Sequence, residues 1–270
     1  MAMIVQHNLR AMNSNRMLNV NSATLGKSTE KLASGYKINR AADDAAGLAM
    51  SEKMRRQVRG LTQASANAQD GVSMVQTAEG ALNEVHDMLQ RMNELAVKAS
   101  NGTLATEDCG YVNNEITALK AEIDRVAKDT DFNGIKLLNA SQTIDIQVGL
   151  AASNVIGITL GKVDCAGLSL SGDTTNQTNA KKLITSVETA IKNLNSKRAD
   201  LGAVQNRLEH TINNLDNVAE NTQAAESRIR DTDMATEMVK YANNNILAQA
   251  GNAMLAQANQ SNQGVLSLLQ

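Results

Sequence analysis

The residue types that usually carry catalysis are sparse and scattered along this chain of 270 residues. No His-Glu-x-x-His pair of zinc ligands, Gly-x-Ser-x-Gly nucleophile turn or glycine-rich phosphate loop occurs in the sequence. The three histidines, which stand alone, are His7, His86 and His210. We expect each of them to be an ordinary surface or helix-packing residue. The sequence therefore predicts a protein that is not an enzyme and that uses no cofactor and no metal ion.

Cysteine usage and charge indicate no particular ligand either. Cys109 and Cys165 lack the short spacing of metal ligands, so two free thiols are the simplest interpretation and a disulfide is the alternative. The formal net charge of −2 provides no basic surface for nucleic acid or an anionic membrane. Residues 1–10 have no apolar signal segment, and no run of ~20 apolar residues occurs. We expect no nucleic-acid or membrane partner, and either a cytoplasmic protein or one exported without a cleaved signal peptide.

The composition favours long helices over a globular core. The chain has no proline or tryptophan, one phenylalanine and three tyrosines. Aromatic side chains normally supply much of a globular core. Ala, Leu, Asn, Gln and Met dominate instead, and they suit helices that pack along narrow seams. We therefore predict a mainly α fold.

Residues 4–32 are predicted to form a helix with only half of a coiled-coil seam. One row of apolar residues, seven apart, comprises Ile4, Ala11, Leu18, Leu25 and Leu32. The companion row is predicted to be polar and to comprise Asn8, Asn15, Ser22 and Thr29. Burial of a leucine contributes roughly 1.5–3 kcal/mol, whereas ordering one residue costs about 1–2 kcal/mol of backbone entropy. One partner cannot offset that cost, so we expect this helix to pack on several sides against other copies of the chain.

The remaining helices follow from apolar heptads. A second long helix runs to about residue 99, and a third begins near residue 106 and folds back antiparallel on it, because the connection is short. A fourth long helix keeps its heptad over residues 187–218, and a final helix begins near Asp233 after a charged interruption. The apolar stripe of this final helix comprises Leu247, Ala250, Met254, Ala258, Val265 and Leu268.

The middle of the chain changes to the alternating pattern of strands. Residues 131–134 form a turn signal, and isoleucines, valine and leucines alternate with polar or small residues over residues 142–160. This alternation predicts a β-hairpin. The segment 169–179 is rich in Ser, Thr, Gly and Asn and is predicted to be a loop. Both stretches are short, so no large separate domain fits in the middle.

The predicted organisation is nearly palindromic. We expect a long antiparallel helical coiled-coil rod with paired terminal helices and a small β-hairpin element. Residues 1–42 with residues 234–270 would form an inner coiled coil of terminal helices. Residues 43–233 would form a middle rod domain, with the hairpin near residues 142–160 and no large outer domain. The simplest arrangement is hairpin-shaped, with both termini at one end.

Several segments, in one order along essentially the whole chain, carry a resemblance to a known family. They are LASGYKIN at 32–39, ADDAAGLA at 42–49, LQRMNELAV at 89–97, SNGT at 100–103, FNGIKLL at 132–138 and NAMLAQANQ at 252–260. Together they resemble bacterial flagellin, in a short form that lacks the large variable outer domain of many relatives.

The resemblance implies a secreted structural subunit of the extracellular flagellar filament, which serves motility. It implies that the chain forms a helical homopolymer with itself, and that its other partners are an export chaperone, the flagellar type III export apparatus, and hook-associated and cap proteins. The residues that we expect to carry assembly are Ile4, Leu18, Leu25, Leu32, Leu247, Met254, Val265 and Leu268. Repeated contacts that do not close build a helical filament, which agrees with the thin seams of the terminal helices.

The resemblance also implies recognition by Toll-like receptor 5 of a host. The family's receptor-binding residues match Arg91, Leu95 and Glu115, with Gln90 adjacent. The spacing alone predicts that Arg91 and Leu95 share a helical face, and an antiparallel return of the third helix brings Glu115 nearby. Without the resemblance, Arg91 would be interpreted as a solvated surface charge and Leu95 as a seam residue.

Two alternatives stay open. A hook–filament junction protein or another hook-associated protein would be built from similar terminal helices, although the runs at 89–103 and 256–260 favour flagellin itself. A coiled-coil adhesin or secreted receptor ligand is the alternative from another class. That interpretation gains if removal of both ends leaves binding intact and no polymer forms.

Overall fold

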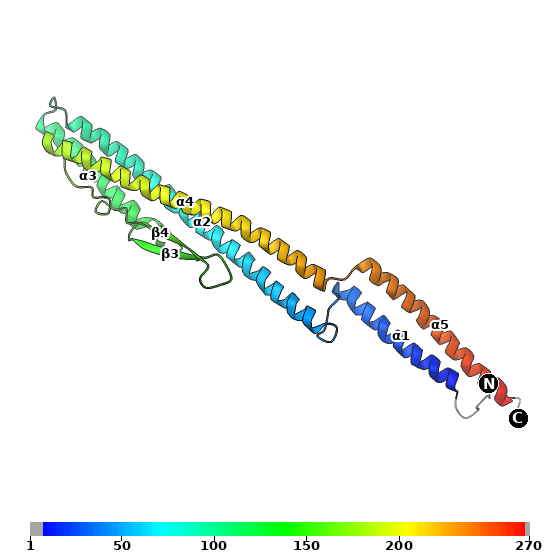
Figure 1. Ribbon diagram of the computed structural model, residues 1–270. Coiled ribbons are helices and arrows are strands. Elements are labelled where there is room, and N and C mark those ends of the chain that lie inside the picture. Colours follow the sequence, from blue (N-terminus) through cyan, green and yellow to red (C-terminus); the bar gives the residue numbers. More distant parts are fainter. Residues whose placement is uncertain (1–7, 268–270) are drawn as a thin grey trace. The chain divides into compact units, whose positions relative to one another are not determined.

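The computed structural model describes residues 8–267, and helices dominate it (Figure 1). The predicted mainly α fold with paired terminal helices and a small β-hairpin is confirmed. In chain order the elements are α1 (Leu9–Ser34), α2 (Ala45–Ala99), α3 (Thr106–Asp129), β1 (Asp131–Phe132), β2 (Ile135–Lys136), β3 (Gln142–Gln147), β4 (Val155–Leu160), α4 (Gln177–Arg230) and α5 (Met234–Ser267). Within the described residues, no helix is both long and apolar enough to cross a membrane.

The chain divides into two compact units whose borders lie inside the long helices α2 and α4. One unit consists of residues 57–220, which we call the central unit, and the parts of the chain on either side form the terminal unit. The division predicted from the sequence follows the helix breaks near residues 42 and 234, and it stays a prediction.

In the terminal unit, α1 and α5 run side by side in opposite directions (Figure 1). The Asn8 side-chain amide donates to the Ala258 carbonyl over 3.1 Å, and the Ser28 hydroxyl donates to the Glu237 carboxylate over 2.7 Å. One pair thus joins the start of α1 to the late part of α5, and the other joins the end of α1 to the start of α5. The expected pairing of the terminal helices is therefore present within one chain.

The polar residues of α1 that are buried or half-buried beside the leucines lie one position before the predicted companion row. The α1 residues with reduced exposure are Ala11, Ser14, Leu18, Asn21, Leu25, Ser28, Glu30, Lys31 and Leu32, with Ser28 the most buried. Of the predicted companion row, Asn8 is half-buried and bonds to α5, whereas Asn15, Ser22 and Thr29 are exposed. A heptad accepts a companion either three or four residues after each leucine. Both rows are polar in this sequence, so the apolar pattern could not choose between them.

The seam of α5 also differs from the predicted stripe. The half-buried α5 residues include Tyr241, Ala248, Gly251, Leu255 and Ala258, whereas Leu247 and Met254 are exposed. Apolar side chains occur on more than one face of α5, so the sequence offered two rows of similar quality. Of the remaining predicted assembly residues, Ile4 and Leu268 and the side chain of Val265 lie outside the described part of the chain.

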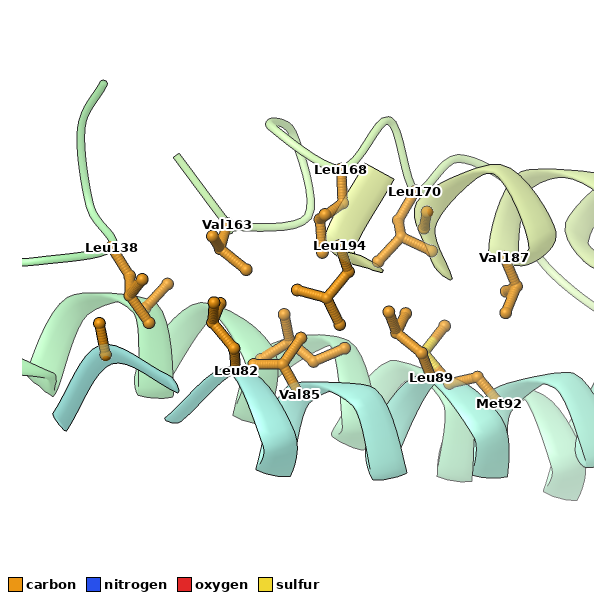
Figure 2. Packing of buried hydrophobic residues seen from close by; sticks show 14 of the residues in the cluster. Leu82, Val85, Leu89, Met92, Leu138, Val163, Leu168, Leu170, Val187 and Leu194 are labelled. Carbon is orange, nitrogen blue, oxygen red and sulfur yellow. The ribbon is translucent and has the colours of Figure 1, made fainter. Parts of the chain in front are cut away.

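The central unit contains the hydrophobic core. The Gln177 side chain of α4 donates to the Ser100 carbonyl over 2.8 Å, and Ser65 of α2 donates to Asp216 of α4 over 2.9 Å, so these helices run antiparallel here. Figure 2 shows Leu82, Val85 and Leu89 of α2 in one apolar layer with Leu194 of α4. Other residues labelled in that layer are Met92, Leu138, Val163, Leu168, Leu170 and Val187. The heptads predicted for the third and fourth helices supply buried residues, among them Ile116, Ile123, Val187, Leu194, Leu201 and Leu208.

Two hairpins follow α3. Strands β3 and β4 pair antiparallel with Ile144 opposite Ile158, which confirms the hairpin predicted near residues 142–160. The turn signal at residues 131–134 is itself a small hairpin of β1 and β2, in which Asn133 and Gly134 have φ values of 50° and 80°. Asn and Gly tolerate this left-handed conformation, so they form the tight turn.

The predicted loop at residues 169–179 is too long by three residues, because α4 begins at Gln177. The first turn of α4 is polar, and its first buried residue is Ala180. An exposed polar first turn has no apolar periodicity, which explains why the sequence pattern missed it.

Candidate functional site

The seam between α1 and α5 buries little apolar surface. Ser28 is the one buried residue along the described α1, and Leu18, Leu25 and Leu32 are only half-buried. Leu18 approaches Gly251 so closely that a Cβ at position 251 would lie 3.3 Å from the Leu18 Cδ1. The absence of a side chain at Gly251 therefore allows Leu18 of α1 to pack closely against α5. This seam orders two long helices with little hydrophobic stabilisation.

Large apolar side chains on the outer faces of the same two helices remain exposed. They are Leu9, Met12, Met17 and Val20 of α1, and Met234, Met238, Val239, Ile246, Leu247 and Met254 of α5. We call these ten residues the terminal-helix surface. Large apolar side chains exposed together on paired helices offer area that a neighbouring molecule can bury. The predicted assembly residues therefore divide in two, because Leu18, Leu25 and Leu32 face α5 whereas Leu247 and Met254 belong to this outer surface.

A polar contact is buried within the seam. Glu237 is 6% exposed, accepts the Ser28 hydrogen bond and lies 3.4 Å from the Lys240 ammonium. The hydrogen bond from Ser28 holds the pKa of the Glu237 carboxyl below its ordinary value, with Lys240 adding to this effect and burial opposing it. Glu237 is therefore charged and partnered in a seam that offers few apolar alternatives. The sequence pattern did not single it out, since a Glu in the first turn of a helix is common.

The second candidate surface lies in the central unit, where α3 returns along α2. The Arg91 Nε and Nη2 atoms both lie 2.9 Å from the Glu115 Oε1, and the Arg91 Nη1 lies 3.1 Å from the Glu94 Oε2. The hydrogen bond to Glu115, followed by that to Glu94, raises the pKa of the Arg91 guanidinium further above its ordinary value. The Arg91 side chain is 52% exposed, so a partner has access to it. The antiparallel return thus brings Arg91 and Glu115 together as predicted.

The other two residues of the predicted receptor-binding set have different environments. Gln90 is exposed, and its side-chain amide lies 3.2 Å from the Nε2 of His86. Leu95 is only 4% exposed and forms, with the buried Val112, the floor of a shallow hollow of about 270 Å³. Leu95 therefore offers a partner very little surface of its own, and its packing supports the helix that carries Arg91.

Sequence reasoning missed two residues of this surface. Glu94 is the second carboxylate on Arg91, and its position three residues later on the same helix is a signal that was available. Tyr111 of α3 is 73% exposed and lines the same hollow. It lies one helical turn before Glu115, but an exposed aromatic residue has no signature in a helical pattern. We call the residues of this region, namely Gln90, Arg91, Glu94, Lys98, Tyr111 and Glu115 above Leu95 and Val112, the Arg91 surface.

Neither surface has the arrangement of a catalytic or metal centre. Within the described residues, no group of three or more His, Cys, Asp or Glu side chains is placed to hold a metal ion. Cys109 and Cys165 are free thiols, as the sequence indicated. Burial, together with a hydrogen bond to Asp124, raises the pKa of the Cys165 thiol to about 12, so this cysteine is not an activated nucleophile.

Comparisons with known proteins agree with this geometry. The family model of the bacterial flagellin N-terminal helical region matches residues 5–143, and that of the bacterial flagellin C-terminal helical region matches residues 184–269. The chain is 53% identical to a flagellin of Halalkalibacterium halodurans and 46% identical to a flagellar filament core protein of Treponema maltophilum, over 99% of this chain and 100% of each relative. A crystal structure of Bacillus cereus flagellin superposes with a TM-score of 0.50 and 34% identity, over 56% of this chain and 88% of that one.

Proposed function

The chain belongs to the bacterial flagellin family, and we propose that it is a structural subunit that polymerises with itself into the extracellular filament of the bacterial flagellum. The observation that carries this proposal is the exposed apolar surface on both terminal helices. Ten large apolar side chains of α1 and α5 face outward while the seam between these helices remains polar and thin. The helix pair is therefore stabilised most when neighbouring subunits cover its outer faces.

The division of the chain into two units supports the same function. The central unit has a continuous buried core, with Leu82, Leu89 and Leu194 almost or entirely inaccessible to solvent, and needs no partner to bury it. Along the parts of α1 and α5 whose side chains the structure describes, no apolar side chain is fully buried. We propose that the terminal helices supply the principal contacts of the polymer, while the central unit keeps its structure through its own core.

The test of polymerisation uses purified full-length protein and short fragments of its own filaments as seeds. We expect monomers to extend the seeds without limit in proportion to the protein added, as measured by electron microscopy of filament lengths. A hook–filament junction protein would add a bounded number of subunits to each end. Monomers that never extend a seed under any condition would contradict the proposal.

We propose further that the chain reaches the filament through the flagellar export apparatus with the help of an export chaperone. Its other proposed partners are hook-associated and cap proteins. Support for these partners comes from family membership alone. The same holds for the inference that the chain is not an enzyme.

A second proposed function is recognition by Toll-like receptor 5 through the Arg91 surface. The specific observation in its favour is that Arg91 is held by Glu115 and Glu94 and yet remains half exposed, so that its guanidinium is oriented before a partner arrives. A preorganised Arg costs less entropy on binding than a free one. We assign the direct contact to Arg91, Gln90 and Glu115, and a supporting position to Leu95 because of its burial.

A further inference from the structure

The methionines of this chain are distributed unevenly with respect to solvent. Among the described methionines, the terminal unit holds six exposed ones, with exposed fractions between 47% and 63%. They are Met12 and Met17 on α1, Met50 at the start of α2, and Met234, Met238 and Met254 on α5. In the central unit, Met74 and Met92 are 3% and 0% exposed, and Met88 is half-buried. The exposed thioethers thus gather on the part of the chain that lacks a core.

The solvent exposure of a methionine determines how readily its sulfur is oxidised. A peroxide transfers one oxygen atom to the methionine sulfur: the sulfur gains an S=O bond and loses two electrons, and hydrogen peroxide is reduced to water. The product, a sulfoxide, is polar and accepts hydrogen bonds, whereas the thioether is a flexible apolar group suited to irregular contacts. The reaction requires access to the sulfur, so it favours the terminal helices over the packed core.

The positions of these methionines connect the chemistry to assembly. Met12 lies with Val20 and Ala23 on one exposed face of α1, away from the seam with α5. Met238 stands next to the exposed Val239, and Met254 is exposed on the same helix. Together with Met17 and Met234, the three methionines make up half of the ten residues of the terminal-helix surface. A sulfoxide within this surface would have to lose its water when a neighbouring subunit covers it, which disfavours the contact.

We propose that Met12, Met17, Met234, Met238 and Met254 are oxidation sites at which peroxide reversibly blocks polymerisation of the free subunit. This inference rests on the proposed function, because it assigns a regulatory chemistry to the same assembly surface. Reduction by methionine sulfoxide reductases restores the thioethers and with them the contact. The central unit keeps its structure throughout, since its buried methionines do not react under the same conditions.

The first measurement locates the oxidation itself and does not depend on assembly. Full-length monomer is treated with increasing hydrogen peroxide, digested, and analysed by peptide mass spectrometry. We expect the five α1 and α5 methionines to gain one oxygen atom each at doses that leave Met74 and Met92 unmodified. Equal or faster oxidation of Met74 and Met92 would overturn the assignment of the sites.

The second measurement tests the consequence. Oxidised monomer is expected to lose extension of filament seeds, and treatment with methionine sulfoxide reductases A and B is expected to restore it. A variant with Met12, Met17, Met234, Met238 and Met254 replaced by leucine should extend seeds before and after peroxide, because Met→Leu conserves volume and removes the reactive sulfur. The matched control carries Met74→Leu and Met92→Leu, and it should remain sensitive to peroxide.

The outcomes separate this inference from the proposed function. Unimpaired seed extension by oxidised natural protein, or equal loss in the five-leucine variant, would refute the regulatory role of these sites. If the five-leucine variant fails to extend seeds without any peroxide, recovery of the oxidised natural chain by the reductases decides the question instead. Failure of the untreated natural chain to polymerise would count against the filament function, while the order of oxidation would still decide where the chain is modified.

Discussion

Ser28 and Glu237 stand 209 residues apart in the sequence and share a buried hydrogen bond of 2.7 Å between α1 and α5. A buried polar pair in a helical seam selects one register, because any shift by a turn leaves a charge without its partner. In this seam the leucines are only half-buried, so they discriminate weakly between registers. The Ser28–Glu237 contact therefore specifies how the two ends of the chain align.

The first prediction concerns the charge state of Glu237. Its pKa is lowered in the folded chain, so its contribution to stability is present above the unfolded pKa of about 4.3 and is lost as the pH falls through the folded pKa. We expect a ¹³C NMR titration of glutamate carboxyls to show Glu237 titrating below the ordinary range, with Glu237→Gln assigning the resonance. Titration at or above the ordinary value would contradict the described hydrogen bond.

The hydrogen bond between Ser28 and Glu237 should contribute measurably to the stability of the α1–α5 pair. Ser28→Ala removes the donor to a charged, buried carboxylate, and such bonds contribute about 1.5–3 kcal/mol. We expect amide exchange of α1 and α5 to accelerate accordingly, with exchange in the core of the central unit unchanged. The control is Ser34→Ala at the exposed end of α1, where the hydroxyl bonds only to nearby backbone, and exchange there should change little.

The leucine row of α1 should be necessary for both pairing and assembly. Leu18→Asp with Leu25→Asp places two charges in the half-buried seam, at a cost of about 2 kcal/mol or more for each lost apolar contact and unpaired charge. We expect the double variant to lose seed extension while circular dichroism retains the helical signal of the central unit. Asn15→Asp with Ser22→Asp, on the exposed row, should preserve the pairing of α1 with α5 as measured by amide exchange.

Receptor signalling should depend on Arg91 in particular. Truncation of an arginine hot spot costs about 2 kcal/mol, so Arg91→Ala should raise the half-maximal concentration in a Toll-like receptor 5 reporter assay by more than about tenfold. Arg125→Ala is the matched control, since Arg125 is also an exposed arginine of the central unit in a network with two carboxylates, Glu122 and Asp129. An identical response to both variants would remove the case for the Arg91 surface.

The sequence predicts the buried face of a helix well only where apolar and polar residues alternate clearly along it. In α4, apolar residues such as Leu194 and Leu201 recur among polar ones, so the buried row is evident and correct. In α1, the rows beginning at Ser14 and Asn15 are both polar, and α5 carries leucines on two faces, at Leu247 and Leu255, so the pattern alone did not indicate which row faces the other helix within one chain. Which residues of α1 and α5 are buried depends on how these two helices pair, although they lie far apart in the sequence. Local periodicity carries no information about that pairing.

The features of the Arg91 surface also differ in how far the sequence predicts them. The approach of Glu115 to Arg91 was predictable because a short connection fixes the antiparallel return of α3. The burial of Leu95 agrees with its interpretation from spacing as a seam residue, but the exposure of Tyr111 was not predictable, because it depends on how far α3 rotates about its own axis. Helix rotation is set by core packing, here around Val112 and Ile116 of α3, and not by the spacing of the surface residues.

The corrected α1 row leads to a prediction that separates it from the row expected at first. Ser14→Leu with Asn21→Leu replaces the polar row that faces α5 by leucines, and each buried leucine contributes roughly 1.5–3 kcal/mol. We expect the monomer to gain protection from amide exchange along α1 and α5. Asn15→Leu with Ser22→Leu adds the same side chains one position later, on the exposed row, and should leave exchange in the monomer nearly unchanged. Greater protection from the second pair than from the first would mean that α1 presents its other polar row to α5 in solution, since equal hydrophobicity at both sites leaves orientation as the remaining difference.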